Sequence, residues 1–204
     1  LKTGVHTIQN FLTEDFYPSY ANFMYILYPL IGITTAFLLG KYVLKDFGGH
    51  GIPDVLFSIS KKSSLLPRVK IFSRVLTSSF TVGFGGSVGL EAPMVMTGSA
   101  IGSNVGALMH LNAKKRTLLI GCGAAGAISA IFGAPIGAVI FAIEVILMEI
   151  STASFIPLLI ASVTGSLTSM LLIGEDSLFN FNLKDSFQAT HMPYYLLLGI
   201  ISGM

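Results

Sequence analysis

The sequence predicts an all-α integral membrane protein, and two observations support this fold class. Only 11% of the 204 residues are charged, and the mean hydropathy is +0.76, whereas a soluble domain carries about 25% charged residues. Long runs also lack any Asp, Glu, Lys or Arg, and they cover residues 16–40, 92–113, 117–143 and 150–174. Because a helix needs roughly 20 such residues to cross the hydrocarbon layer, these runs are typical of membrane spans.

The order of the expected elements follows from the glycines, prolines and charges between the apolar runs. The first half should contain a long span within 16–44, a turn-rich break at 45–54, a short helix at 55–60, a basic loop at 61–70, and a span that starts near Ile71 with Arg74 near its entry. The second half should contain a glycine-rich break at 83–93, a helix from Pro93 to about Leu111, a basic loop at 112–116, two helices within 117–149 split at Phe132–Pro135, a span at Ser154–Ile173, a polar loop at 174–192 and an apolar segment from about Pro193.

Charge gives two further expectations. Loops 61–74 and 114–116 are rich in Lys and Arg, so the positive-inside rule places both on the cytoplasmic side of a lipid bilayer. The net charge of +2 is too small to indicate a nucleic-acid partner.

Two breaks share the pattern Gly-xxx-Pro followed by an apolar helix. They are "GHGIP" (Gly49, His50, Gly51, Ile52, Pro53) and "GLEAP" (Gly89, Leu90, Glu91, Ala92, Pro93). Proline suits the first turn of a helix, so each break indicates a helix that starts within the membrane. A helix start exposes free N–H groups and about half a positive charge, and two starts aimed at one point would bind an anion without Lys or Arg. The alternative is a pair of kinked helices in which glycine serves packing.

Glu91 is a carboxylate inside an otherwise uncharged run, within the first turn of one of these helices. The helix dipole favours a negative charge there, so the carboxylate can itself occupy the anion site. Protonation, or displacement by a mobile anion, would move it aside, which makes Glu91 a candidate gate and proton acceptor. The alternative is a carboxylate that only caps a helix near the membrane surface.

At these residues the sequence resembles the CLC family of chloride channels and chloride/proton exchangers. "GHGIP" is similar to the family's first anion-site motif, and "GLEAP" to its gate motif. The segment Gly121–Glu144 is similar to a family segment with a small-residue helix, a Pro-containing turn and a helix that ends in acids. The resemblance covers roughly residues 16–204.

The resemblance implies a broken-helix bundle of two inverted repeats and a homodimer with one pore in each subunit. Residues 1–204 would form one incomplete transmembrane domain that holds the first repeat and the start of the second, without the second half of the pore. The expected function is transmembrane transport of chloride or a similar small anion, with possible coupling to proton exchange, and not catalysis by an enzyme. The expected location is the bacterial plasma (inner) membrane.

Three positions depart from the family pattern. His50 stands where a Ser is common, and Ala92 replaces a common Gly. At the family's inner proton-transfer acid the alignment gives Val145, with Glu144 one residue earlier. Because Val cannot carry a proton, the resemblance leaves open an exchanger with a different inner path through Glu144, Glu149 or His50, and an uncoupled anion channel.

Two other readings stay open from the sequence. "GCGAAG" (Gly121–Gly126) fits the dinucleotide fingerprint, although its surroundings lack the expected βαβ pattern. A membrane carrier of another small anion or solute would share the broken helices. No His, Cys, Asp or Glu cluster has the spacing of metal ligands, so we expect no metal and no cofactor. Gly98, Gly102 and Gly106 form a small-residue ridge that predicts close helix packing.

Overall fold

The computed structural model describes residues 5, 7, 21–46, 51–147, 152–173 and 192–203, and every element in these ranges is helical. In chain order the elements are α2 (Ala21–Leu38), the π-helical turn η1 (Leu39–Val43), α3 (Ile52–Lys61), α4 (Lys70–Gly83), α5 (Glu91–Leu108), α6 (Ala113–Phe132), α7 (Pro135–Phe141), the π-helical turn η2 (Ala142–Leu147), α8 (Thr152–Ile173) and α9 (Met192–Ser202). The predicted all-α fold is confirmed over these ranges.

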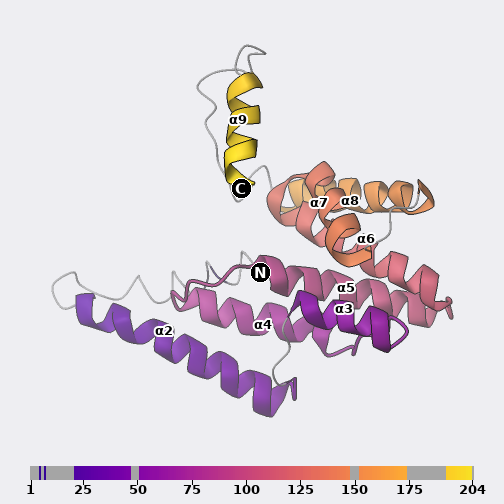
Figure 1. Ribbon diagram of the computed structural model, residues 1–204. Coiled ribbons are helices and arrows are strands. Elements are labelled where there is room, and N and C mark those ends of the chain that lie inside the picture. The colour runs from indigo at the N-terminus through magenta and orange to yellow at the C-terminus, as the bar shows by residue number, and fades with distance from the viewer. Residues whose placement is uncertain are drawn as a thin grey trace.

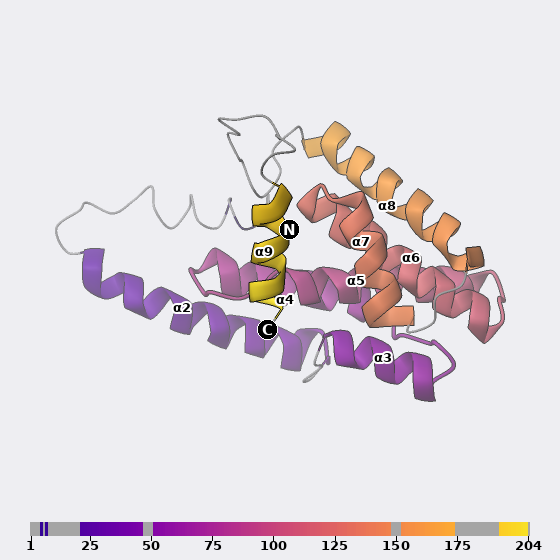
Figure 2. The ribbon, with the colours of Figure 1, turned by 45° about the horizontal axis from the view of Figure 1, so that its top comes forward.

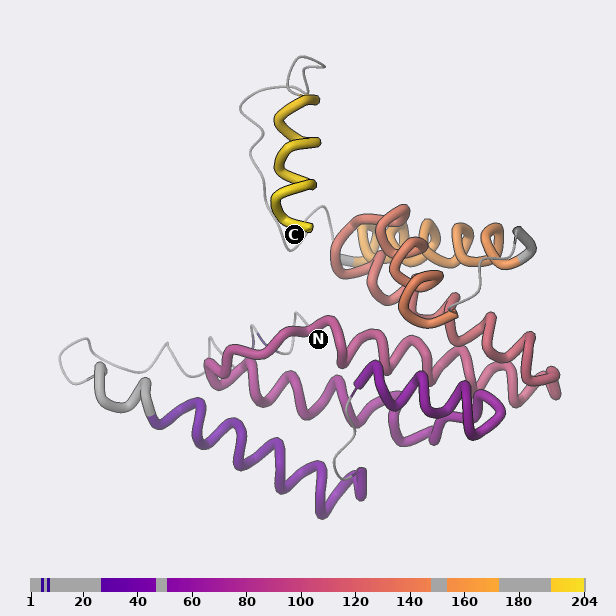
Figure 3. Tube along the Cα trace, viewed as in Figure 1, coloured from indigo at the N-terminus to yellow at the C-terminus, as the bar shows by residue number. Residues whose placement is uncertain are grey.

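The long helices pack in a continuous row. Figure 1 shows α2 on α4, α4 on α5, α5 on α6 and α6 on α8. The short helix α3 contacts α5 and η2, and α7 packs between α6 and α8, as the turned view in Figure 2 also shows. Helix α9 stands apart from this row in Figure 3, and its described side chains are exposed. Helices α5 and α6 therefore form the centre of the described structure.

Glycines bring the backbones of α5 and α6 into direct contact. A Cβ added to Gly98 would lie 2.1 Å from the carbonyl oxygen of Gly123, and one added to Gly123 would lie 2.0 Å from the carbonyl oxygen of Gly98. One turn further along α5, a Cβ on Gly102 would lie 2.0 Å from the carbonyl oxygen of Leu119. Only glycine fits at such distances, so the prediction that the ridge serves packing is confirmed.

The main hydrophobic core lies where α3, α5, α6, α7 and η2 meet. Its fully or almost fully buried members include Val55, Val95, Met96, Ile120, Ala138 and Ile146. The core therefore fixes the short α3 against the α5–α6 pair.

The helix breaks lie close to where the sequence predicts them, with shifted boundaries. Helix α5 begins at Glu91 rather than Pro93, because Leu90 is already in the right-handed helical region and its carbonyl accepts from the Met94 N–H at 3.3 Å. The break predicted at 83–93 is thus reduced to residues 84–90. The predicted split after Phe132 is confirmed: Gly133 ends α6 with a φ of 64°, and Pro135 opens α7.

Judged by length and hydropathy alone, two of the described helices can cross a membrane, at Ala113–Phe132 and Ser154–Leu172. Helix α4 has 14 residues, which is about 21 Å of rise against a hydrocarbon core of about 30 Å. The span expected from Ile71 is therefore only part of a crossing, because the chain leaves the helix at Phe84.

We predict that Gly98→Ala destabilises the protein strongly. The added methyl group has no space against the backbone of Gly123, and overpacking of this kind typically lowers the free energy of unfolding by about 1–3 kcal/mol. The measurement is the thermal unfolding midpoint of the full protein in detergent.

Gly137→Ala is the matched control. A Cβ on Gly137 would lie 3.9 Å from the Cβ of Ala134, an ordinary contact, so its unfolding midpoint should stay near the wild-type value. Equal midpoints for the Gly98 and Gly137 variants would show that the α5–α6 contact is not tight.

Candidate anion site

Two helices begin at the Gly-xxx-Pro breaks, and their starts lie against each other. Helix α3 starts at Ile52 after Gly51, whose φ of 69° lies in the left-handed region that favours glycine. Helix α5 starts at Glu91 after Leu90. A Cβ placed on Gly51 would lie 3.1 Å from the Cβ of Ala92. Breaks 40 residues apart in sequence are therefore in close contact.

The predicted anion-binding residues have different outcomes. Gly49 and His50 lie outside the described residues. The structure brings Gly51 against Ala92. The remaining predicted residues are chain neighbours of these two: Ile52 and Pro53 follow Gly51, Leu90 and Glu91 precede Ala92, and Pro93 follows it. Gly89 is exposed, and a Cβ added to it would meet no atom within 4 Å.

Neither of these helix starts is capped by a side chain. Helix α3 has Gly51 at its N-cap and helix α5 has Leu90, and neither N-cap side chain accepts a hydrogen bond. By contrast, the Oδ1 atom of Asn112 caps α6 by accepting from the Lys115 N–H at 3.0 Å. The first N–H groups of a helix have no partner within the helix, so both starts present unused donors and a positive dipole end.

Glu91 is the first residue of α5, and its side chain is exposed. The carboxylate makes no hydrogen bond or ion pair with any residue that the structure describes. It therefore lies at the end of the helix where a negative charge is stabilised, without a hydrogen bond or ion pair to the described residues. These are the properties that a movable carboxylate needs.

Two ion pairs hold the chain on either side of the break before α3. Lys70 Nζ lies 2.6 Å from Asp54 Oδ2, which ties the first turn of α3 to the first turn of α4. Asp46 Oδ2 accepts from the buried Ser73 hydroxyl at 2.6 Å and lies 3.6 Å from Arg74 Nε. Both basic residues thus lie next to acids, but the buried Nε and Nη2 atoms of Arg74 have no hydrogen-bond partner among the described residues.

The sequence analysis did not assign a role to these acids. A signal was present: Lys70 and Arg74 are one helical turn apart at the start of an apolar helix, and Asp46 and Asp54 flank the break at 45–54. Two bases and two acids in such an uncharged sequence indicate that they form ion pairs. The sequence does not indicate which acid pairs with which base.

The residues predicted for an inner proton path point in different directions. Glu144 is exposed on η2, whereas Val145 is partly buried and packs against the main core. Adjacent residues of a helix differ by about 100° around its axis, which accounts for the difference. The described structure therefore has an apolar side chain at position 145, and Glu144 does not replace it there.

The dinucleotide fingerprint is wrong as an indicator of a nucleotide site. Gly121, Gly123 and Gly126 lie within α6, not in a loop between a strand and a helix. Each is close to a neighbouring element: a Cβ on Gly121 would lie 3.3 Å from the side chain of Leu147, and one on Gly126 would lie 3.2 Å from the carbonyl of Ala161. These glycines serve helix packing.

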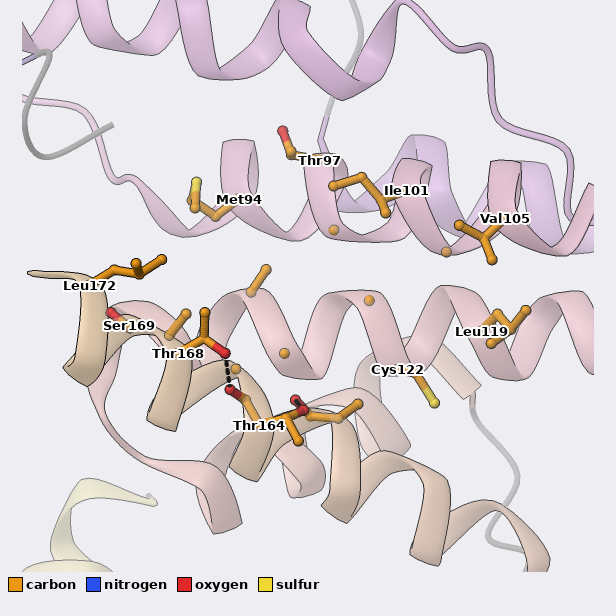
Figure 4. Close-up of a pocket in the computed structure, with 18 residues that line it drawn as sticks. Met94, Thr97, Ile101, Val105, Leu119, Cys122, Thr164, Thr168, Ser169 and Leu172 are labelled. Atoms are coloured by element: carbon orange, nitrogen blue, oxygen red, sulfur yellow. Dashed lines mark hydrogen bonds between the residues drawn. The ribbon is translucent and has the colours of Figure 1, made fainter. Parts of the chain in front are cut away.

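A groove of about 680 Å³ lies between α5, α6 and α8 (Figure 4). Its described lining residues include no Asp, Glu, Lys, Arg or His. Two of its hydroxyls are used within α8, where Thr168 donates to the Thr164 carbonyl at 2.7 Å and Thr164 donates to the Ile160 carbonyl at 2.7 Å. The buried hydroxyl of Thr97, on α5, has no hydrogen-bond partner among the described residues. Because no charged side chain among the described residues lines the groove, the two uncapped helix starts remain the candidate anion site.

Comparison with known proteins identifies the family of the chain. The family model described as "Voltage gated chloride channel" matches residues 31–204. The putative chloride channel protein ClcB-like of Ralstonia nicotianae is 30% identical over 183 residues, which is 88% of this chain and 43% of that protein. The H(+)/Cl(-) exchange transporter ClcA of Yersinia pestis is 27% identical over 192 residues, 90% of this chain and 40% of that protein. The chain thus spans less than half the length of these relatives.

Two solved structures share the fold. A slow cyanobacterial Cl−/H+ antiporter has a TM-score of 0.75 at 20% identity, and the match covers 98% of this chain and 49% of the antiporter chain. A CLC-type fluoride/proton antiporter has a TM-score of 0.73 at 26% identity, and covers 99% of this chain and 49% of its own. Because the family model matches residues 31–204, the chain belongs to the voltage-gated chloride channel (CLC) family of membrane transport proteins.

Proposed function

We propose that the protein transports chloride or a similar small anion across the membrane in exchange for protons. The observation that carries the proposal is the contact of two uncapped helix starts at Gly51 and Ala92. Unused N–H groups and two positive dipole ends at one point favour an anion without a basic side chain. The names of the relatives support the substrate class, because they mention chloride, fluoride and protons.

In this proposal the anion binds to the two breaks, residues 49–53 and 89–93, through backbone N–H groups near His50, Gly51 and Ile52 and near Glu91 and Ala92. Pro53 and Pro93 have no N–H and start the helices. Glu91 is the gate and the proton acceptor. Its ionised carboxylate competes with the anion for the start of α5, and protonation removes that competition. The exposed position of Glu91, and its lack of contacts with the described residues, support this role.

The second candidate function is uncoupled anion conduction. The observation that favours it is the apolar Val145, which packs against the core where the resemblance expects a proton-carrying acid. Glu144 is exposed on another side of η2, so an exchanger would need a different inner path for the proton.

We also propose that the protein is a homodimer in a bacterial plasma (inner) membrane. Support for the dimer comes from the exposed apolar faces of α7 and α8, where Ile136 is 72% exposed, Ile156 63% and Ile160 59%. Support for the location comes from the bacterial relatives.

Cysteines introduced at Ile156 and Ile160 should cross-link two subunits in native membranes, and membranes that yield only monomers would contradict the dimer.

We predict that Gly51→Ala weakens chloride binding by about tenfold or more, which is ~1.4 kcal/mol. The substitution strains a residue with a φ of 69° and presses a methyl group against Ala92. The measurement is titration calorimetry with chloride on the detergent-solubilised full protein.

Gly133→Ala provides the control for backbone strain. Gly133 has a similar φ of 64°, but a Cβ there meets no atom within 4 Å. The control should therefore bind chloride as the wild type does. If both variants bind equally well, the contact at Gly51 does not shape the site.

For the gate, we predict that Glu91→Gln keeps anion flux but removes its response to pH. A neutral amide neither competes with the anion nor carries a proton. The measurement is the reversal potential of liposomes with opposed chloride and proton gradients. In the wild type it should depend on both gradients, and in the variant on chloride alone.

Glu144→Gln is the control, because it removes an exposed carboxylate from η2, and it should behave as the wild type does. A Glu91 variant that keeps the wild-type response to pH would argue against its role as gate. A wild-type potential that follows chloride alone would favour the uncoupled channel.

A further inference from the structure

A buried hydroxyl on α5 makes two hydrogen bonds to the loop that joins α3 to α4. Ser103 on α5 has no exposed surface. Its Oγ atom donates to the carbonyl of Ser64 at 2.7 Å and accepts from the N–H of Leu66 at 2.9 Å. One hydroxyl thus satisfies a donor and an acceptor of the loop backbone, neither of which would otherwise have a partner away from water.

Other contacts surround this loop. On α5, Asn104 Nδ2 donates to the carbonyl of Leu66 at 3.2 Å. On α6, Arg116 Nη1 donates to the carbonyl of Ser63 at 2.9 Å, and the hydroxyls of Ser64 and Thr117 lie 2.6 Å apart. The loop is therefore fixed to both central helices, and Ser103 and Asn104 supply its attachment to α5.

The position of Ser103 along α5 links this attachment to the candidate anion site. Helices α3 and α5 contact each other at their starts, through Gly51 and Ala92. Ser103 lies roughly 17 Å from Ala92 along the axis of α5, given the rise per residue of an α-helix. The chain that leaves α3 meets α5 again at Ser103. The two helices thus run in the same direction and are joined near both ends.

We propose that Ser103 is a positioning residue for anion selectivity. It fixes α3 along the axis of α5, and thereby sets the spacing between the two helix starts. Ser103 does not contact the anion, and the inference rests on the proposed function. Two helix starts at a fixed spacing discriminate among anions by size, because their N–H groups cannot follow a larger ion outward. Without the Ser103 bonds, α3 can shift along α5, and the discrimination weakens.

The test uses Ser103→Ala in the full protein reconstituted in liposomes. The measured quantity is the ratio of chloride flux to iodide flux, because these two halides differ in size and carry the same charge. Because the substitution removes both hydrogen bonds between Ser103 and the loop, we expect a ratio reduced by about threefold to tenfold. Ser103→Thr keeps the hydroxyl and should restore most of the ratio.

Ser64→Ala is the matched control. It removes a hydroxyl that is also buried, in the same loop, and breaks the contact with Thr117. It leaves both Ser103 bonds in place, since Ser64 meets Ser103 through its backbone carbonyl. The control should keep the wild-type flux ratio. If Ser103 only stabilised the fold, both variants would lower thermal stability and leave the ratio unchanged, and that result would overturn the proposal.

A further variant covers the case in which Ser103→Ala does not fold. Asn104→Ala removes the longer bond to the Leu66 carbonyl, so the ratio should fall in the same direction by a smaller factor. An unchanged ratio in a folded Asn104 variant would overturn the proposal, as would a wild type that carries both halides equally well. Wild-type liposomes that pass no halide at all would overturn the proposed function itself.

Discussion

The described structure depends on the backbone contact between α5 and α6. Gly98 and Gly123 approach so closely that neither position has space for a methyl group. In a protein surrounded by lipid, helices gain little from burying apolar side chains against one another, and close packing of small residues takes a larger share in their association. The contact extends from α6 to α8, because a Cβ on Gly165 would lie 2.5 Å from the carbonyl of Gly126. The helix that carries Glu91 is thus anchored to the rest of the row.

Around the α5–α6 pair, both ion pairs and uncharged hydrogen bonds fix the segments before and after α3. Asp54 pairs with Lys70 and Asp46 with Arg74, so each base near the break before α3 is next to an acid. Ser103 and Asn104 fix the loop after α3 with uncharged groups. Buried polar atoms usually have partners. In the described part of the chain some lack one, namely guanidinium nitrogens of Arg74 and Arg116 and the hydroxyls of Thr97, Ser99 and Ser129.

The sequence predicted the local structure of this protein better than its contacts. Gly and Pro act on the residues next to them, so both helix starts and the split at Gly133 could be predicted from local patterns, although α3 begins at Ile52 and not at residue 55. The boundary at Glu91 was missed by two residues, because the conformation of Leu90 depends on the fold around it. The close approach of Gly51 to Ala92 is a contact over 41 positions, which no local pattern encodes.

The same limit applies to the candidate site. The carboxylate of Glu91 was conspicuous because its surroundings are uncharged, whereas Ser103 looks like any other serine in a small-residue helix. Its role depends on the return of the chain after α3, which only the structure shows. The fingerprint at Gly121–Gly126 is the opposite case, a pattern that suggested a site where there is none. The same spacing of glycines occurs in nucleotide-binding loops and in packed helices.

The missing caps of α3 and α5 have a consequence for how far such a protein can be stabilised. A Ser, Asp or Asn at the N-cap typically adds about 1 kcal/mol to the stability of a helix, and α6 has such a cap in Asn112. At Gly51 and Leu90 the same improvement would place a permanent acceptor on the groups that we propose for the anion. The most stable sequence and the most active one therefore differ at these positions. Under the proposed function, the transported ion itself acts as a removable cap, so the folded state becomes more stable as the anion concentration rises.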